Sequence, residues 1–257
     1  MVTIFHEFIR WFAASTPKWH IKTVCCMSIL ICFALKEEAA PFHKIAAKHP
    51  GVVPVIVGIG RANAESSIRR ALTAPANSPD HPAAPDLVIT CGFAGGLNPK
   101  YQLGDVLFEL FPGELVTSPI SLPVLPADLT AKLTAAGAQA ATFFCADRIA
   151  TTVAEKQALR AATGADAVEM ESAAIHAVCR ERSIPCVTVR VISDTAGENL
   201  PLDFNVLAKP DRSLDFQKLF WAIAKAPWKI SALLALQKKT TSAAQQLATV
   251  LEKVISP

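Results

Sequence analysis

Two acidic side chains stand where apolar runs of the chain end. Glu171 follows a short strand-like segment and precedes a helix expected over residues 172–182. Asp194 closes the apolar run 186–192, in which polar and apolar residues hardly alternate. Both carboxylates are therefore expected at the carboxyl ends of strands, where open α/β sheets place their ligand crevice. Carboxylates in such a crevice can transfer a proton or stabilise positive charge on a substrate.

A structural role is the alternative for each carboxylate taken alone. Glu171 could stabilise the positive end of the helix dipole from the first turn of its helix. Glu38 lies in the acidic helix start 36–40, directly after a strand expected over residues 28–34, and has the same two interpretations. For Glu171 and Asp194 together we favour the functional interpretation, because both are brought to strand ends.

The elements that must position these residues predict an α/β domain. Runs at 28–34, 52–57, 86–91 and 186–192 are apolar almost throughout, as in parallel strands buried on both faces. Glycine-containing turns follow two of the runs, at Gly58–Gly60 and Gly92–Gly96, and let the backbone approach a ligand closely. The first turn leads into a helix and can cradle an anion, although it lacks the third glycine of the dinucleotide fingerprint.

Composition narrows the class of protein. A chain of 257 residues with 51% hydrophobic and 18% charged residues is long enough for one large α/β domain and too apolar for a disordered chain. Its seven cysteines contain no zinc-type CxxC pair. This pattern predicts a reduced, cytoplasmic protein with no structural metal and no cofactor.

We divide the chain into three parts. Residues 1–26 are expected to be an N-terminal extension with amphipathic helical spacing, residues 27–205 the main domain, and residues 206–257 basic amphipathic helices. The last part holds eight basic and three acidic residues, a net +5 against +3 for the whole chain. Basic helices with tryptophan can lie in a membrane interface, and packing against the domain or a second subunit is the alternative. No nucleic-acid motif accompanies the lysines, so nucleic acid is not an expected partner.

Four segments, in this order, resemble the purine nucleoside phosphorylase and nucleosidase superfamily. They are Gly58–Gly60, Gly92–Leu97 with Gly104-Asp105, Val168–Glu171 and Val191–Asp194. The match spans residues 28–204 and looks nearest to the methylthioadenosine/S-adenosylhomocysteine nucleosidases. The resemblance implies a three-layer α/β/α fold with a central mixed, largely parallel sheet, and a homo-oligomer, a dimer or larger. It also implies cleavage of the N-glycosidic bond of a small-molecule purine nucleoside.

The resemblance implies roles for individual residues. Asp194 is similar to the acid that protonates or hydrogen-bonds purine N7, and Ser193 to the residue that steadies this acid. Glu38 matches the glutamate that activates water. Glu171 resembles the carboxylate that binds the ribose hydroxyls, with Met170 packing on the sugar. The other positions expected to contact the substrate are Glu169, Phe93, Ala94, Gly95 and Ile149.

Departures from the family pattern bear on reaction and substrate. Phosphorylases of the superfamily commonly hold phosphate with an arginine at the position of Thr90, so this chain favours hydrolysis. Arg61 or Arg148 could still reach an anion, which keeps phosphorolysis as the alternative, beside a binding protein that has lost catalysis. Phe93 replaces a small serine and Ile149 a stacking phenylalanine of the nucleosidases, which predicts a less usual substrate.

A narrower resemblance accounts for these departures. Residues 146–149, 152–167 and 210–228 resemble hopanoid-associated phosphorylase-like proteins. That resemblance implies removal of adenine from adenosylhopane, a 5′-modified adenosine whose substituent is a lipid. A basic, tryptophan-bearing tail would then bring a cytoplasmic enzyme to the inner face of the membrane as a peripheral protein.

Overall fold

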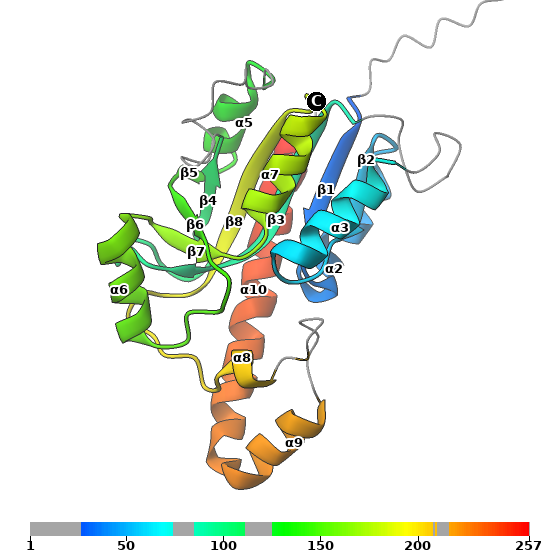
Figure 1. Ribbon diagram of the computed structural model, residues 1–257. Helices are drawn as coiled ribbons and strands as arrows, with labels where there is room; N and C mark the ends of the chain where they lie inside the picture. Colours follow the sequence, from blue (N-terminus) through cyan, green and yellow to red (C-terminus); the bar gives the residue numbers. More distant parts are fainter. Residues whose placement is uncertain (1–26, 74–84, 111–124, 208, 210–215, 257) are drawn as a thin grey trace, which may run out of the picture.

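In the computed structural model the described residues are 27–73, 85–110, 125–207, 209 and 216–256 (Figure 1). The N-terminal extension expected over residues 1–26 lies outside them. The described part is built on one eight-stranded sheet. Its strands are β1 (Ile29–Phe33), β2 (Val52–Ile56), β3 (Leu87–Gly96), β4 (Val106–Glu109), β5 (Gln139–Ala140), β6 (Phe143–Cys145), β7 (Ala167–Glu169) and β8 (Cys186–Asp194).

The sheet is mixed and largely parallel. Its main order is β2-β1-β3-β8-β4-β5, and β7 pairs with the end of β3 and with β6. Strands β2, β1, β3 and β8 are parallel, with Ile31 opposite Ile89 and Ile89 opposite Val187. Strand β4 runs antiparallel to β8, and β7 antiparallel to β3.

Helices cover both faces of the sheet, because side chains along each buried strand point alternately to opposite faces. Ile29, Ile31 and Phe33 of β1 join the core under α2, α5 and α10, whereas Leu30 and Cys32 join the core under α3 and α7. The expected three-layer α/β/α fold is confirmed. The helices are α2 (Lys36–Ala46), α3 (Arg61–Ala71), α5 (Leu129–Ala135), α6 (Val153–Thr163), α7 (Ser172–Glu181), α8 (Phe204–Leu207), α9 (Phe216–Lys225) and α10 (Ile230–Ile255), with the 3-10 turn η1 (Pro227–Lys229).

The C-terminal segment divides into two regions with different surroundings. The second half of α10 belongs to the main core, where Ala243, Leu247 and Leu251 are buried against the sheet and α2. The first half of α10 and α9 project away from the sheet (Figure 1). We call residues 216–240 the α9–α10 hairpin. No helix among the described residues is long and apolar enough to cross a membrane.

The parallel strands bring their carboxyl ends to one edge of the sheet. The loop after β1 leads into α2, the loop after β2 leads into α3, and β8 ends at Asp194. The end of β3 lies between them, because its residues Phe93 and Ala94 pair with Val191 and Ile192 of β8. This edge collects the polar residues that the sequence singles out.

Two leucines of α10 test the division of the C-terminal segment. Leu247→Ala should lower the free energy of unfolding by about 2–5 kcal/mol, because it leaves a cavity in the core. Leu234→Ala, whose side chain is 54% exposed, should change it by less than about 0.5 kcal/mol. Urea denaturation of both variants measures the difference. Equal effects would mean that the two halves of α10 are packed alike.

Candidate active site

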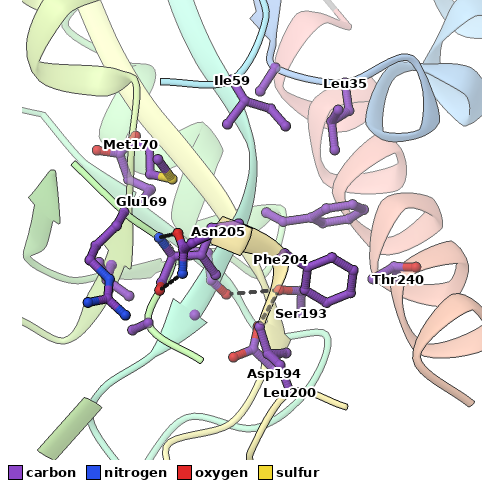
Figure 2. Close-up of a pocket in the computed structure, with 18 of the residues that line it drawn as sticks. Leu35, Ile59, Glu169, Met170, Ser193, Asp194, Leu200, Phe204, Asn205 and Thr240 are labelled. Atoms are coloured by element: carbon purple, nitrogen blue, oxygen red, sulfur yellow. Dashed lines mark hydrogen bonds between the residues drawn. The ribbon is translucent and has the colours of Figure 1, made fainter. Parts of the chain in front are cut away.

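One cavity at the carboxyl edge of the sheet has a volume of about 1070 Å³ (Figure 2). All the residues that the sequence proposes for a site line it, although they come from α2, β3, β7, β8 and the loops beside them. They are Glu38, Phe93, Ala94, Gly95, Ile149, Glu169, Met170, Glu171, Ser193 and Asp194. The sheet therefore brings together side chains that lie more than 150 residues apart in the chain.

A buried arginine stands behind the carboxylates of this cavity. Arg190 lies on β8 and is 1% exposed. Its Nη2 is 2.5 Å from Glu169 Oε2 and its Nη1 is 3.2 Å from Glu171 Oε2. Nη2 also donates a hydrogen bond to Thr90 Oγ1 at 3.3 Å. Thr90 stands where phosphorylases of the superfamily commonly carry an arginine. It is fully buried, and its hydroxyl supports Arg190.

The sequence leaves open whether Glu171 stabilises the N-terminus of α7 or lines a ligand site. In the structure Glu169 and Glu171 have different partners. Glu169 accepts hydrogen bonds from the backbone N–H groups of Glu171 and Ser172, at 3.0 and 2.8 Å, and from the Ser172 hydroxyl. Glu169 therefore satisfies the N-terminus of α7. The Glu171 side chain instead accepts the N–H of Gly60 at 2.8 Å. The anion cradled by the glycine turn before α3 is this carboxylate, and the turn fixes it in the cavity wall.

Glu38 has both a local and a distant partner. Its Oε2 accepts the N–H of Leu35 at 2.9 Å, which is a capping contact at the start of α2. Its Oε1 accepts the N–H of Phe93 on β3 at 2.9 Å. Gly92, at φ +150°, makes room for this arrangement, since a Cβ atom there would lie 2.8 Å from both Glu38 Oε1 and Arg190 Nη1.

One guanidinium faces three carboxyl groups, and their charges cannot all be balanced. Burial raises the pKa of Glu38 to about 7, although the Arg190 charge opposes the shift. Burial also raises the pKa of Glu171 despite Arg190, and the charge of Glu169 adds to the rise. For Glu169 the effect of burial is outweighed by Arg190 and by the hydrogen bonds from Ser172, so its pKa lies below the usual range. Arg190 and Glu169 thus form the fixed ion pair of the site.

Asp194 has a separate set of partners at another part of the cavity. Its Oδ1 accepts the Ser193 hydroxyl at 2.7 Å (Figure 2). Its Oδ2 lies 2.5 Å from Nζ of Lys156, a lysine on α6 that is fully buried. Helix α6 begins at an N-cap formed by Thr152, whose hydroxyl accepts the N–H of Glu155 at 3.2 Å.

The loop that carries Ile149 is held by an asparagine of α8. Asn205 Oδ1 accepts the Ile149 N–H at 2.8 Å, and its Nδ2 donates to the Ile149 carbonyl at 3.0 Å (Figure 2). Around them the cavity is largely apolar. Its apolar lining includes Leu35, Ile59, Phe93, Met170, Leu200, Phe204, Val206 and Leu236.

The two arginines expected to reach an anion have other partners. Arg61 donates to the carbonyl of Cys145 at 2.7 Å and lies 3.5 Å from Asp147. Arg148 lines the cavity, and its guanidinium is 2.6 Å from Glu155. Neither arginine belongs to the polar group around Glu38 and Glu171.

Sequence reasoning does not identify three residues of this site. Arg190 has a detectable signal, because a charged residue inside a strand buried on both faces must be paired. The sequence signal for Lys156 is weak, because a lysine on a helix is ordinarily expected to face solvent and nothing nearby marks this one as buried. Asn205 acts on another segment 56 residues away, and its neighbours in sequence do not reveal the contact. Among the described residues, no three His, Cys, Asp or Glu side chains are grouped as metal ligands.

The raised pKa of Glu38 predicts a dependence of stability on pH. In the unfolded chain Glu38 ionises near pH 4.5 and in the folded protein near pH 7. The folded state therefore binds this proton more tightly, and stability falls as the pH rises from 4.5 through 7. Relative to Glu38→Gln, the wild-type protein should lose up to about 3 kcal/mol of unfolding free energy between pH 5 and pH 8. Urea denaturation at both pH values measures this; a constant difference would contradict a buried, raised carboxyl.

Comparisons with known proteins show the family and the fold of this chain. The family model of the phosphorylase superfamily matches residues 111–225. The 5′-methylthioadenosine/S-adenosylhomocysteine nucleosidase of Marinomonas sp. (strain MWYL1) is 30% identical over 179 residues, which are 62% of this chain and 74% of that protein. The aminodeoxyfutalosine nucleosidase of Campylobacter jejuni is 29% identical over 139 residues, 44% of this chain and 58% of that protein.

Solved structures share the fold at lower identity. The futalosine hydrolase of Helicobacter pylori matches with a TM-score of 0.60 and 18% identity, over 90% of this chain and 97% of that one. The 5′-methylthioadenosine/S-adenosylhomocysteine nucleosidase of Neisseria meningitidis, in complex with methylthio-immucillin-A, matches with a TM-score of 0.59 and 19% identity, over 88% and 97% of the chains. At these identities the likeness concerns the fold. From the fold and the sequence relatives together, the chain belongs to the phosphorylase superfamily and is similar to its methylthioadenosine/S-adenosylhomocysteine nucleosidases.

Proposed function

We propose that this protein is a purine nucleosidase that hydrolyses the N-glycosidic bond of a 5′-modified adenosine and releases adenine. The observation that carries the proposal is the convergence of Glu38, Glu171 and Asp194 on one cavity. Sequence relatives of this chain are nucleosidases. In such an enzyme these three carboxyl groups would supply the acid, the base and the sugar ligand that the reaction needs.

Breaking the bond between ribose and base places positive charge on the ribosyl ring and negative charge on the purine. Glu171, fixed by Gly60 and Arg190, would bind the ribose hydroxyls and stabilise the cation. Asp194 would transfer a proton to N7 of the departing base. Glu38, whose pKa is about 7, can take a proton from water near neutral pH while its two backbone hydrogen bonds hold it in place.

Adenine recognition is assigned to the backbone of Ile149. A neighbouring N–H donor and C=O acceptor match the edge of adenine, which presents a ring-nitrogen acceptor beside the N6 amino donor. The Asn205 carboxamide satisfies both Ile149 groups with the same pattern of donor and acceptor. A bound adenine would therefore replace Asn205 at Ile149. The Phe93 ring and Met170 supply apolar contacts for base and sugar in the same cavity.

Hydrolysis is preferred over phosphorolysis for a structural reason. The position at which phosphorylases of the superfamily commonly carry an arginine is Thr90, whose hydroxyl accepts from the buried Arg190. Arg61 and Arg148 are engaged with Asp147 and Glu155. The alternatives are a phosphorylase and an inactive nucleoside-binding protein of the same fold. The presence of all three carboxyl groups in one cavity favours an enzyme.

The cavity leaves room for a substituent beyond the nucleoside. Its volume of about 1070 Å³ lies just above the roughly 300–1,000 Å³ of ordinary ligand sites. Val206, Lys209, Leu236 and Thr240 also line it, so it extends to the base of the α9–α10 hairpin. A long apolar 5′ substituent could leave the site along this side, and adenosylhopane is our specific candidate substrate.

The α9–α10 hairpin would hold the enzyme at the inner face of the membrane, from which such a substrate could enter the cavity. Trp221, Trp228 and Leu234 are 62%, 72% and 54% exposed. Residues 216–240 hold five lysines and no acidic residue, a combination that suits an anionic lipid surface. A symmetric contact between two copies of this surface would bring like charges together. The homo-oligomer that we expect would form through another face.

Turnover by an Asp194 variant tests the enzymatic assignment. Asp194→Asn should lose about 10²–10⁴-fold in the rate of adenine release from 5′-methylthioadenosine, because the proton donor is removed. Asp128→Asn, the same change at the exposed residue that precedes α5, should keep the wild-type rate. Calorimetric titration with adenine identifies an inactive binding protein, which would bind the base without turnover. A rate that requires added phosphate would indicate a phosphorylase.

Vesicle binding tests the membrane contact. The full chain should sediment with vesicles of phosphatidylglycerol and phosphatidylcholine at low salt and much less with phosphatidylcholine alone, since screening and loss of anionic lipid both weaken the attraction. Trp221→Ala/Trp228→Ala should reduce sedimentation without changing the melting temperature. Equal binding of the double variant, or dimerisation through the hairpin, would contradict the proposal.

A further inference from the structure

Lys156 is a buried charge that the proposed chemistry has not yet used. Its side chain has no exposed surface, and its Nζ lies 2.5 Å from Oδ2 of Asp194. Nζ donates hydrogen bonds to the carbonyl oxygens of Thr195 at 2.7 Å and Glu198 at 2.9 Å. A lysine is rarely fully buried without a paired charge. Its partner here is the residue that we assign as the proton donor.

The surroundings of Asp194 match a carboxylate rather than a carboxylic acid. Oδ1 accepts the Ser193 hydroxyl, and Oδ2 faces the ammonium group. Oδ2 is buried at this contact, and 11% of the Asp194 side chain remains exposed in the cavity. An ionised carboxylate only accepts hydrogen bonds. A purine that carries a proton on N7 could donate it to this carboxylate, whereas a neutral substrate with a bare N7 could not.

Other charges near this pair are balanced or lie elsewhere in the cavity. Glu198 is neutralised by Lys239 of α10 at 2.6 Å. Glu169 and Glu171 share Arg190. The remaining charged groups that line the cavity are Glu37, Glu38, Asp147, Arg148, Asp203 and Lys209. Among the described residues, Lys156 is the cation placed in direct contact with Asp194.

We propose that Lys156 is a positioning residue that stabilises the carboxylate left on Asp194 when its proton has moved to the purine. The proposal rests on the proposed function. Asp194 takes up a proton from solvent before the neutral substrate reacts. As the bond from C1′ to N9 then breaks, its electron pair goes to the purine and the Asp194 proton goes to N7. A water oxygen bonds to C1′, and Glu38 takes the proton of that water. The ion pair between Lys156 and Asp194 is thus the state in which the transfer ends, and the site is complementary to the departing base.

Binding of two bases tests this complementarity. Adenine has a bare N7, whereas 9-deazaadenine carries a proton on N7 because carbon replaces N9. By calorimetry at pH 7, wild-type protein should bind 9-deazaadenine at least about tenfold more tightly, the worth of a hydrogen bond to a charged group. Lys156→Met, of similar length and without charge, should bring this ratio close to one. An unchanged ratio in the variant, or a wild-type preference for adenine, would overturn the proposal.

Removing both charges provides a second test that does not depend on the stability of the single variant. Lys156→Met/Asp194→Asn leaves no unpaired buried charge, which is the main threat to folding. If Lys156 acts through Asp194, the double variant and Asp194→Asn should release adenine from 5′-methylthioadenosine at rates within about threefold of each other. A further loss of about tenfold or more, at an unchanged melting temperature, would mean that Lys156 acts independently and would overturn the proposal.

Different results would contradict the proposed function and the role of Lys156. Absence of adenine release by the wild-type protein from any adenosine derivative would remove the proposed function. Normal wild-type turnover together with a base-binding ratio that ignores Lys156→Met would remove only the role of Lys156.

Discussion

The buried guanidinium of Arg190 is the interaction on which the site depends. It stands on the central strand β8 and contacts Glu169 and Glu171, with its charge also acting on Glu38. An unpaired charge at this depth would be strongly destabilising, so the arginine and its carboxylates must fold together. One positive charge cannot ionise all three carboxyl groups fully. Burial, which the Arg190 charge offsets only in part, leaves Glu38 with a pKa of about 7, where a carboxyl group can exchange protons with water.

Backbone N–H groups, together with Arg190, hold the carboxylates of the site in place. Gly60, Leu35 and Phe93 direct their N–H groups at Glu171 and Glu38 from three different loops and strands. Gly92 leaves the space in which Glu38 and Arg190 approach each other. Such contacts hold a functional carboxylate without adding another charge. A second charge pair, Lys156 with Asp194, is built from α6 and β8, so the acidic groups assigned to sugar and base have separate electrostatic surroundings.

Much of the fold could be predicted from the sequence, because uniformly apolar strands and amphipathic helices are local patterns. The carboxyl-end rule for parallel strands also predicts where Glu38, Glu171 and Asp194 should meet. Long-range partners are different. A lysine on a helix is ordinarily solvated, so Lys156 was not expected in the core, and the structural role foreseen for Glu171 at α7 is filled by Glu169. These assignments depend on which elements pack together, which local patterns do not specify.

Cleavage in water enriched in ¹⁸O tests the central claim most directly. Wild-type protein incubated with 5′-methylthioadenosine or another 5′-modified adenosine should release free adenine, and mass spectrometry should find one ¹⁸O atom on the released sugar. This result would show that the bond is cleaved with water and not with phosphate, as the account requires. Release of an unlabelled sugar phosphate, or no adenine from any adenosine derivative, would contradict the account.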